Sequence, residues 1–172
     1  LSRQAHTYSL SVVAVRELRV AAVDLRNGLL TAESSQRGYL FSGNEIYLAP
    51  FDSAKTAARR QVTELEGDAK RYPEIAPLVG QLSSLVEAKI AEMEETIALK
   101  RATRDEDAMD LFLSNRGKAL MDQTNLFVTG ILETADRLLL EGVAEQTENA
   151  GLLRWVSIAG LTAILHLIHQ PI

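Results

Sequence analysis

Residues 15–43 read VRELRVAAVDLRNGLLTAESSQRGYLFSG, and this stretch decides the fold. One seam of residues recurs in it at spacings that alternate between three and four: Val15, Leu18, Ala22, Leu25, Leu29, Ala32, Gln36, Tyr39 and Gly43. A sustained heptad seam is typical of helices that pack in left-handed bundles or coiled coils. It predicts a helix from about Ser9 to Ser42, where Gly43 can adopt the left-handed conformation that caps a helix.

Two more amphipathic segments follow this helix. The second helix is expected from Pro50, whose missing N–H costs nothing in a first helical turn, to about Tyr72, which the next proline pushes out of helical geometry. The third is expected from Pro73 or Pro77 to Arg104. Its apolar stripe is Leu78, Leu82, Leu85, Lys89 or Ile90, Met93 and Ile97.

The fourth helix is expected to begin at Asp105, because the acidic residues there would lie at the positive end of the helix dipole. Its stripe includes Met109, Leu113, Gly117, Leu120, Thr124, Phe127, Ile131, Ala135 and Leu138. It is expected to run without a break to about Asn149 and even into the apolar segment beyond.

Four amphipathic helices with short connections predict an all-α, antiparallel up-down four-helix bundle. The first and last helices are longer than the two between them, so we expect them to project together as a membrane-proximal stalk. Residues 1–150 would then form the bundle domain and residues 151–172 an apolar tail. This arrangement places Leu1 and the tail at the same end.

The tail reads as the start of a transmembrane helix. Residues 152–168 are almost entirely apolar, and as a helix they would span about 25 Å, just short of a bilayer core. Arg154 and Trp155 are a cation and an aromatic of the kind found at a membrane interface. A buried C-terminal helix is the alternative. The chain starts with Leu1 rather than methionine, so we also expect a segment upstream.

The composition excludes several classes of function. A net charge of −5 argues against a nucleic-acid partner, which needs clustered Lys and Arg. Cysteine is absent, which removes disulfides and thiolate chemistry. The three histidines, His6, His166 and His169, lie near the chain ends, and none follows a glutamate by three residues. We therefore expect no metal site, no cofactor and no catalytic site, so that this chain is not itself an enzyme.

A polar group interrupts the seam at the end of the first helix. Gln36 falls in the seam itself, and Glu33 and Arg37 stand four apart in the order that favours an ion pair. Gly38 would allow close approach of a neighbouring helix, while Tyr39 and Tyr47 carry hydroxyls that need partners. One interpretation is a buried structural network tying the first helix to the second and fourth. The other is a ligand or switch site formed by these six residues.

The segment from Thr31 to Phe51, TAESSQRGYLFSGNEIYLAPF, closely resembles the hallmark of the third class of CHASE domains. These are the extracellular sensory domains of cyclases and histidine kinases. The family pattern is an acid, then Gln-Arg-Gly-Tyr-Leu, then Gly-Asp or Gly-Asn, then Tyr-Leu-x-Pro-Tyr, and Phe51 stands here in place of the last tyrosine. Residues 116–122, RGKALMD, are similar to a second family motif. Together the motifs cover about residues 24–136.

The resemblance implies a bundle that faces the periplasm from the cell inner membrane, between two transmembrane helices, with an output module inside. The tail would be the second of these helices, and the first would precede Leu1. We expect a sensor histidine kinase of a two-component system that transmits its stimulus by helix displacement. We also expect a homodimer that packs through the first or the fourth helix.

Three alternatives stay open: a chemoreceptor ectodomain, a cyclase ectodomain, and a membrane-attached helical scaffold that binds partners without sensing. A scaffold has little reason to place polar groups on the seam. The ligand, whether small molecule or protein, is not identified by any motif.

Overall fold

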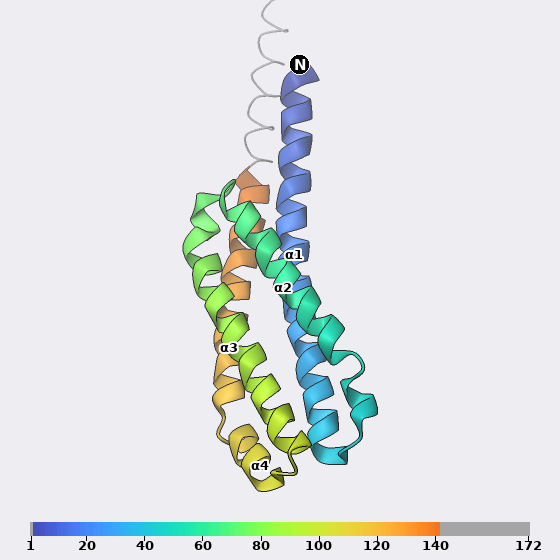
Figure 1. The fold of residues 1–172 in the computed structure, drawn as a ribbon. Coiled ribbons are helices and arrows are strands. Elements are labelled where there is room, and N and C mark those ends of the chain that lie inside the picture. Colours follow the sequence, from blue (N-terminus) through green and yellow to red (C-terminus); the bar gives the residue numbers. More distant parts are fainter. Residues whose placement is uncertain (1, 142–172) are drawn as a thin grey trace, which may run out of the picture.

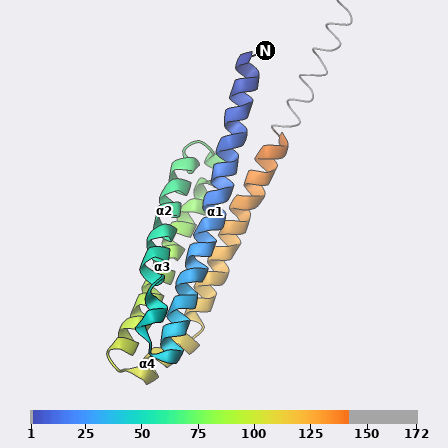
Figure 2. The same cartoon turned by 90° about the vertical axis from the view of Figure 1, so that its right-hand side faces the viewer.

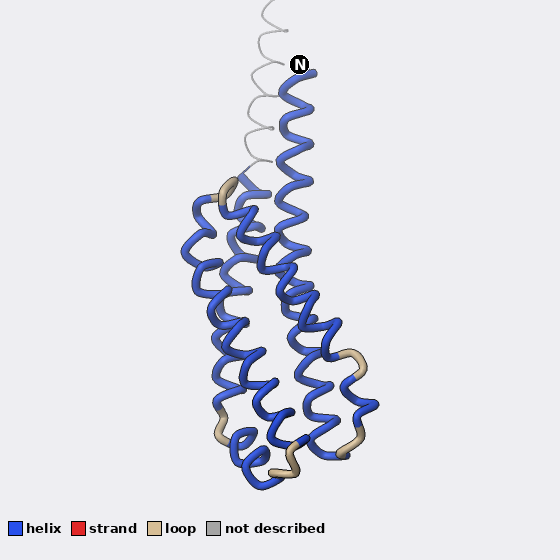
Figure 3. Tube along the Cα trace, viewed as in Figure 1, coloured by secondary structure: helices blue, strands red, loops and turns tan. Residues whose placement is uncertain are grey.

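The computed structural model describes residues 2–141, with side chains from residue 12 onward. The elements in chain order are the helix α1 (Ser2–Ser42), the 3₁₀ turn η1 (Glu45–Leu48), the helix α2 (Phe51–Ala69), the 3₁₀ turn η2 (Pro73–Ile75), the helices α3 (Ala76–Arg101) and α4 (Asp105–Leu113), and a last helix over residues 116–141. Short loops join these helices, and no strand occurs among the described residues (Figure 3).

The four long helices form an antiparallel up-down bundle, which confirms the predicted fold class (Figure 1). α1 runs from the N-terminal end to the opposite end, α2 returns, α3 runs down again, and the 116–141 helix returns. α1 lies beside the 116–141 helix (Figure 2). Arg19 of α1 and Asp136 of the last helix form an ion pair that joins the two.

The heptad seam forms the centre of the core, as predicted. Every seam residue from Val15 to Tyr39 is buried, and Leu18, Leu25 and Leu29 are fully so. On α3, however, the buried apolar face is Val79, Leu82, Val86, Ile90, Met93 and Ile97, while the predicted Leu78 and Leu85 lie at its edge. Lys89 is buried together with Ile90.

The end of α1 has the predicted glycine cap. Gly43 adopts φ +68°, and its N–H donates to the carbonyl of Tyr39 at 2.8 Å. Asn44 then starts η1, because its side-chain oxygen accepts a hydrogen bond from the N–H of Ile46 at 3.0 Å. This two-step cap reverses the chain into α2.

The prediction of one unbroken fourth helix from Asp105 was wrong. α4 ends at Leu113, and Asn115 adopts φ 62° before the 116–141 helix begins. Asparagine tolerates this left-handed conformation better than most residues do, so it can serve as the corner. α4 therefore folds across the end of the bundle (Figure 1). α3 also ends three residues earlier than predicted, and Thr103 follows it with φ 57°.

α1 has 41 residues and is about 60 Å long at 1.5 Å per residue. It extends beyond the ends of α2 and α3 (Figures 1 and 2). Between residues 2 and 141, no helix combines the length and the apolar character that crossing a bilayer requires. The predicted tail of residues 151–172 lies outside the described residues.

Candidate functional site

A buried ion cluster joins α1 to α3. The ammonium Nζ of Lys89 lies 3.1 Å from Oε1 of Glu33 and 3.0 Å from Oε2 of Glu92. The Lys89 and Glu92 side chains are 1% and 2% exposed, and that of Glu33 is 12% exposed. Arg37 Nη2 approaches the same Glu33 oxygen at 3.2 Å, so the predicted ion pair of Glu33 and Arg37 is present. Buried charges are tolerated only when they are paired in this way.

Gln36 lies on α1 one turn from this cluster and is fully buried. Neither its amide nitrogen Nε2 nor its oxygen Oε1 has a hydrogen-bond partner among the described residues. A buried amide without partners costs about 1–3 kcal/mol of stability relative to a satisfied one. Such a group is an exception in a folded protein, and a water molecule or a ligand in an adjoining cavity could satisfy it.

Gln36 and the ion cluster line one cavity of about 270 Å³, called here the polar cavity. Four segments contribute to its wall: α1, α3, α4 with its following corner, and the start of the 116–141 helix. The lining residues are Glu33, Gln36, Arg37, Lys89, Glu92, Phe112, Leu113, Asn115, Gly117 and Lys118. α4, which supplies Phe112 and Leu113, lies at the end of the bundle opposite the N-terminus (Figure 1).

Gly117 lets the last helix approach the ion cluster. A Cβ at this position would lie 2.7 Å from the carboxylate oxygen Oε2 of Glu92, closer than atoms in contact can come. Glu92 in turn holds Lys89, which holds Glu33 of α1. The position of the 116–141 helix is therefore sterically coupled to the ion pairs between α1 and α3.

α4 supplies the aromatic part of the cavity wall. The ring of Phe112 packs edge-on against Phe41 of α1, with 5.9 Å between ring centroids. The Arg37 guanidinium lies 5.9 Å from the Phe112 centroid, in the range of a cation–π contact. Arg37 thus contacts both the Glu33 carboxylate and the α4 ring, at the edge of the cavity.

The structure divides the six predicted site residues into two groups. Glu33, Gln36 and Arg37 line the polar cavity. Gly38 faces the other way, toward Tyr47, since a Cβ on it would meet Cδ1 of that ring at 2.6 Å. Tyr39 is buried in the core, and neither tyrosine lines the polar cavity.

Tyr39 forms a hydrogen bond with Glu45 of η1, which also forms an ion pair with Arg101. Arg101 of α3 donates to both carboxylate oxygens of Glu45, at 2.8 and 2.7 Å. This contact holds the pKa of Glu45 below its ordinary value, and a hydrogen bond from Tyr39 contributes in the same direction. The ion pair between Glu45 and Arg101 therefore connects η1 to α3.

Lys89 and Glu92 are site residues that the sequence analysis did not identify. Lys89 appeared only as an alternative to Ile90 in the apolar stripe of the third helix. The expected network between the first helix and the second and fourth was wrong in its main partner, because α3 supplies the buried ammonium. A lysine within an apolar stripe, with a glutamate three residues later, is the signal that could have located the cluster.

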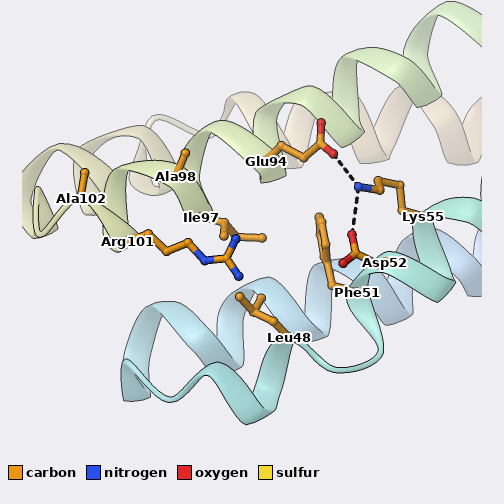
Figure 4. Close-up of a pocket in the computed structure, with 9 residues that line it drawn as sticks. All are labelled: Leu48, Phe51, Asp52, Lys55, Glu94, Ile97, Ala98, Arg101 and Ala102. Carbon is orange, nitrogen blue, oxygen red and sulfur yellow. Dashed lines mark hydrogen bonds and ion pairs between the residues drawn. The ribbon is translucent and has the colours of Figure 1, made fainter.

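A larger pocket of about 530 Å³ lies between η1, the start of α2 and the end of α3 (Figure 4). Its floor is apolar, with Leu48, Phe51 and Ile97. The Lys55 ammonium lies 3.0 Å from Asp52 and 2.7 Å from Glu94, and these contacts raise its pKa, the one with Glu94 most. The cations of both cavities are paired with acids, but only the polar cavity is lined by a buried side-chain amide without a partner among the described residues, that of Gln36. We therefore favour the polar cavity as the functional site.

The fold and the first motif can be compared with known proteins. A family model described as the CHASE3 domain matches residues 8–145. Among solved structures, the chain is similar to the sensor domain of the histidine kinase HK9 of Rhodopseudomonas palustris, at 21% sequence identity and a TM-score of 0.67. That likeness covers 73% of this chain and 98% of the other, and at this identity it shows the fold alone. No curated protein matches the chain.

Proposed function

The chain belongs to the CHASE3 domain family of sensory domains, and from this premise we propose that it is the extracytoplasmic signal-input domain of a transmembrane sensor histidine kinase. The structural similarity to a histidine kinase sensor domain favours a kinase over a chemoreceptor or a cyclase as the parent protein. In this proposal the domain faces the periplasm from the inner membrane, attached through helices that flank it, and it has no catalytic role of its own.

One observation carries the proposal: the polar cavity is lined by both α1 and the 116–141 helix. These are the first and the last helix of the bundle, and both lead to the end where the N-terminus lies (Figure 2). A change in the cavity would therefore act on the two helices that lead to the membrane.

The proposed mechanism is a small displacement of α1 relative to the 116–141 helix. Lys89 holds Glu33 of α1, while Glu92 contacts Gly117 of the last helix. Rearranging these contacts changes how the two helices meet. Shifts of about 1–2 Å are sufficient in other helical switches. Glu33 lies 31 residues from Ser2 along α1, so the shift would be carried over roughly 45 Å.

We propose that two copies associate through their long helices. α1 carries exposed apolar residues at Val13 and Val20, seven residues apart on one face. This is the spacing of a coiled-coil seam. A dimer would give each shift of α1 a fixed partner against which to move.

To test the proposed function, the input domain of a sensor kinase with a measurable reporter output is replaced with this chain. The reporter output is then measured in cells. We expect Gln36→Leu to lock or bias the output, because it changes the interior of the polar cavity. The matched control is Gln61→Leu, which replaces another buried glutamine, on α2, outside the cavity. Equal output from wild type, Gln36→Leu and Gln61→Leu under every condition would support a non-sensing scaffold instead.

A further inference from the structure

We propose that the polar cavity binds a small organic anion, a monocarboxylate that also carries a hydroxyl or amide group. This inference rests on the proposed function, since it names the class of signal that the input domain receives. It follows from the hydrogen-bonding groups, the charge and the size of the cavity.

The hydrogen-bonding requirement comes from Gln36. Its amide offers two N–H donors and one acceptor oxygen, and within the described part of the chain neither atom has a partner. A ligand group that both donates and accepts, such as a hydroxyl or a carboxamide, would satisfy the amide nitrogen and oxygen together. A purely apolar ligand would leave the amide unsatisfied.

The charge requirement comes from the cations of the lining. Arg37, Lys89 and Lys118 line the cavity together with two carboxylates, Glu33 and Glu92. Lys118 is also paired with Asp122 of its own helix, and a ligand carboxylate can replace Asp122 in this exposed pair at little cost. The Arg37 and Lys118 side chains are 54% and 70% exposed, which places them at the mouth of the cavity. A carboxylate there would be bound by charge-assisted hydrogen bonds.

A metal ion fits this lining poorly. The two carboxylates that could bind a cation are already bridged by the Lys89 ammonium. A divalent ion would have to displace that ammonium from a position where its side chain is 1% exposed, and a buried lysine without its carboxylates is strongly unfavourable. The cavity is therefore a poor site for a metal cation.

The size requirement comes from the volume and the apolar wall. About 270 Å³ equals the share of roughly nine water molecules in liquid water, just below the range of about 300–1,000 Å³ for drug-sized ligands. Phe112 and Leu113 of α4 give one wall an apolar surface. A short carbon chain between the carboxylate and the hydroxyl or amide would pack against them.

The test uses the chain of residues 1–172 in detergent micelles and follows the side-chain amide resonances of Gln36 by NMR. The probes with both groups are 4-hydroxybutanoate, 5-hydroxypentanoate and succinamate. Butanoate and pentanoate lack the hydrogen-bonding group, and 1,4-butanediol lacks the charge. We expect at least one of the first three to shift the Gln36 resonances with saturation, and to bind about tenfold more tightly than its matched control, a difference of about 1.4 kcal/mol.

Two variants locate the site. Lys118→Glu should weaken binding about tenfold or more, while Gln61→Leu should leave the affinity unchanged. Gln36→Leu should also weaken binding about tenfold or more; this variant has no side-chain amide at residue 36, so its binding is followed by the backbone amide resonance of that residue. Lys118 is on the surface, so its variant should fold even if a cavity variant does not. The proposal is overturned if no probe shifts the Gln36 resonances up to about 10 mM, above the dissociation constant of a millimolar site. It is also overturned if Lys118→Glu binds as the wild type does.

The proposed signalling function and the proposed ligand class can each be rejected without rejecting the other. A kinase chimera that responds to a stimulus although no probe binds would retain the input-domain role and reject this ligand class. A probe that binds at Gln36 but never changes the chimera's output would retain the binding site and reject the signalling role.

Discussion

Lys89 of α3 and Glu33 of α1 form an ion pair in the interior of the bundle, with 3.1 Å between Nζ and Oε1. Glu92 binds the same ammonium from the next turn of α3. One lysine therefore contacts two carboxylates, and a third helix reaches the group through Gly117. This arrangement holds charge at the point where the first and last helices of the bundle meet the polar cavity.

Replacing Lys89 with methionine should strongly destabilise the domain. The substitution keeps the volume but leaves Glu33 and Glu92 buried without a cation, and breaking a buried pair in this way costs about 3–5 kcal/mol. Urea unfolding followed by circular dichroism measures the change. Replacing all three residues with apolar ones (Glu33→Leu, Lys89→Met, Glu92→Leu) should recover most of the loss. A single variant as stable as the wild type would show that the cluster is not buried as described.

Gly117→Ala should destabilise the domain by about 1–3 kcal/mol, because the added methyl group would push the Glu92 carboxylate away from Lys89. Gly80→Ala is the matched control, since nothing lies within 4 Å of a Cβ at that position on α3. Alanine there should raise the stability by about 0.5–1 kcal/mol through better helix propensity. Thermal melts of the two variants should shift in opposite directions; equal shifts would contradict the close approach at Gly117.

Thr103→Gly should stabilise the turn after α3. Thr103 is β-branched and adopts φ 57°, a left-handed conformation that costs most residues roughly 1–2 kcal/mol. Glycine removes this cost but loses more conformational entropy on folding. The net increase in the free energy of unfolding should be up to about 1 kcal/mol. Thr103→Ala keeps the Cβ atom and should show no such gain in the urea midpoint.

The domain should lose stability as the pH falls below about 4.5. The Arg101 and Arg59 hydrogen bonds hold the pKa values of Glu45 and Glu87 below their ordinary value of 4.5. In the unfolded chain these carboxyls regain that value, so the folded state binds fewer protons in this range. Their contribution is complete above pH 4.5 and is lost as the pH falls through the lowered values.

Mutations can separate the contributions of individual carboxyl groups to the loss of stability at low pH. Glu45→Gln and Glu87→Gln should each flatten the decline of the urea midpoint between neutral and acidic pH. Asp68 is the control, because its effect on stability at low pH should have the opposite sign. Desolvation raises the pKa of Asp68, so its protonation favours the folded state. Asp68→Asn should therefore make the decline steeper. A decline that none of the three variants alters would reject this account.

Much of the fold follows from sequence periodicity. The seam of α1 was predicted residue by residue because a heptad pattern specifies which face is buried. The end of α1 at Ser42 and the start of α2 after Pro50 could be predicted because glycine and proline restrict the backbone locally. The break at Asn115 was missed because asparagine is compatible with a helix interior, and only the packing of α4 across the bundle end determines the corner.

The sequence identified some residues of the candidate site and missed others. Glu33, Gln36 and Arg37 were identified because each is polar on or beside an apolar seam. Lys89 and Glu92 were not, since contacts between α1 and α3 depend on how the helices are rotated about their axes. Tyr47 and Gly38 contact each other, but away from the polar cavity, because adjacent residues on a helix face in different directions.

The most direct test of the account is a distance measurement between α1 and the 116–141 helix by pulsed electron paramagnetic resonance. The chain has no cysteine, so Val20→Cys and Leu126→Cys, both at exposed positions, would carry the only spin labels. Leu126 lies ten residues from Asp136, the partner of Arg19, and thus roughly 15 Å along the helix axis, so sliding changes the distance.

The comparison is between the doubly labelled chain with and without Gln36→Leu, each diluted with unlabelled protein to suppress signals between copies. We expect the distance distribution to move by about 1–2 Å or to divide into two populations in the Gln36→Leu variant, and to stay unchanged in Gln61→Leu. Distributions that superimpose for all three proteins would contradict the claim that the polar cavity sets the relative position of these two helices.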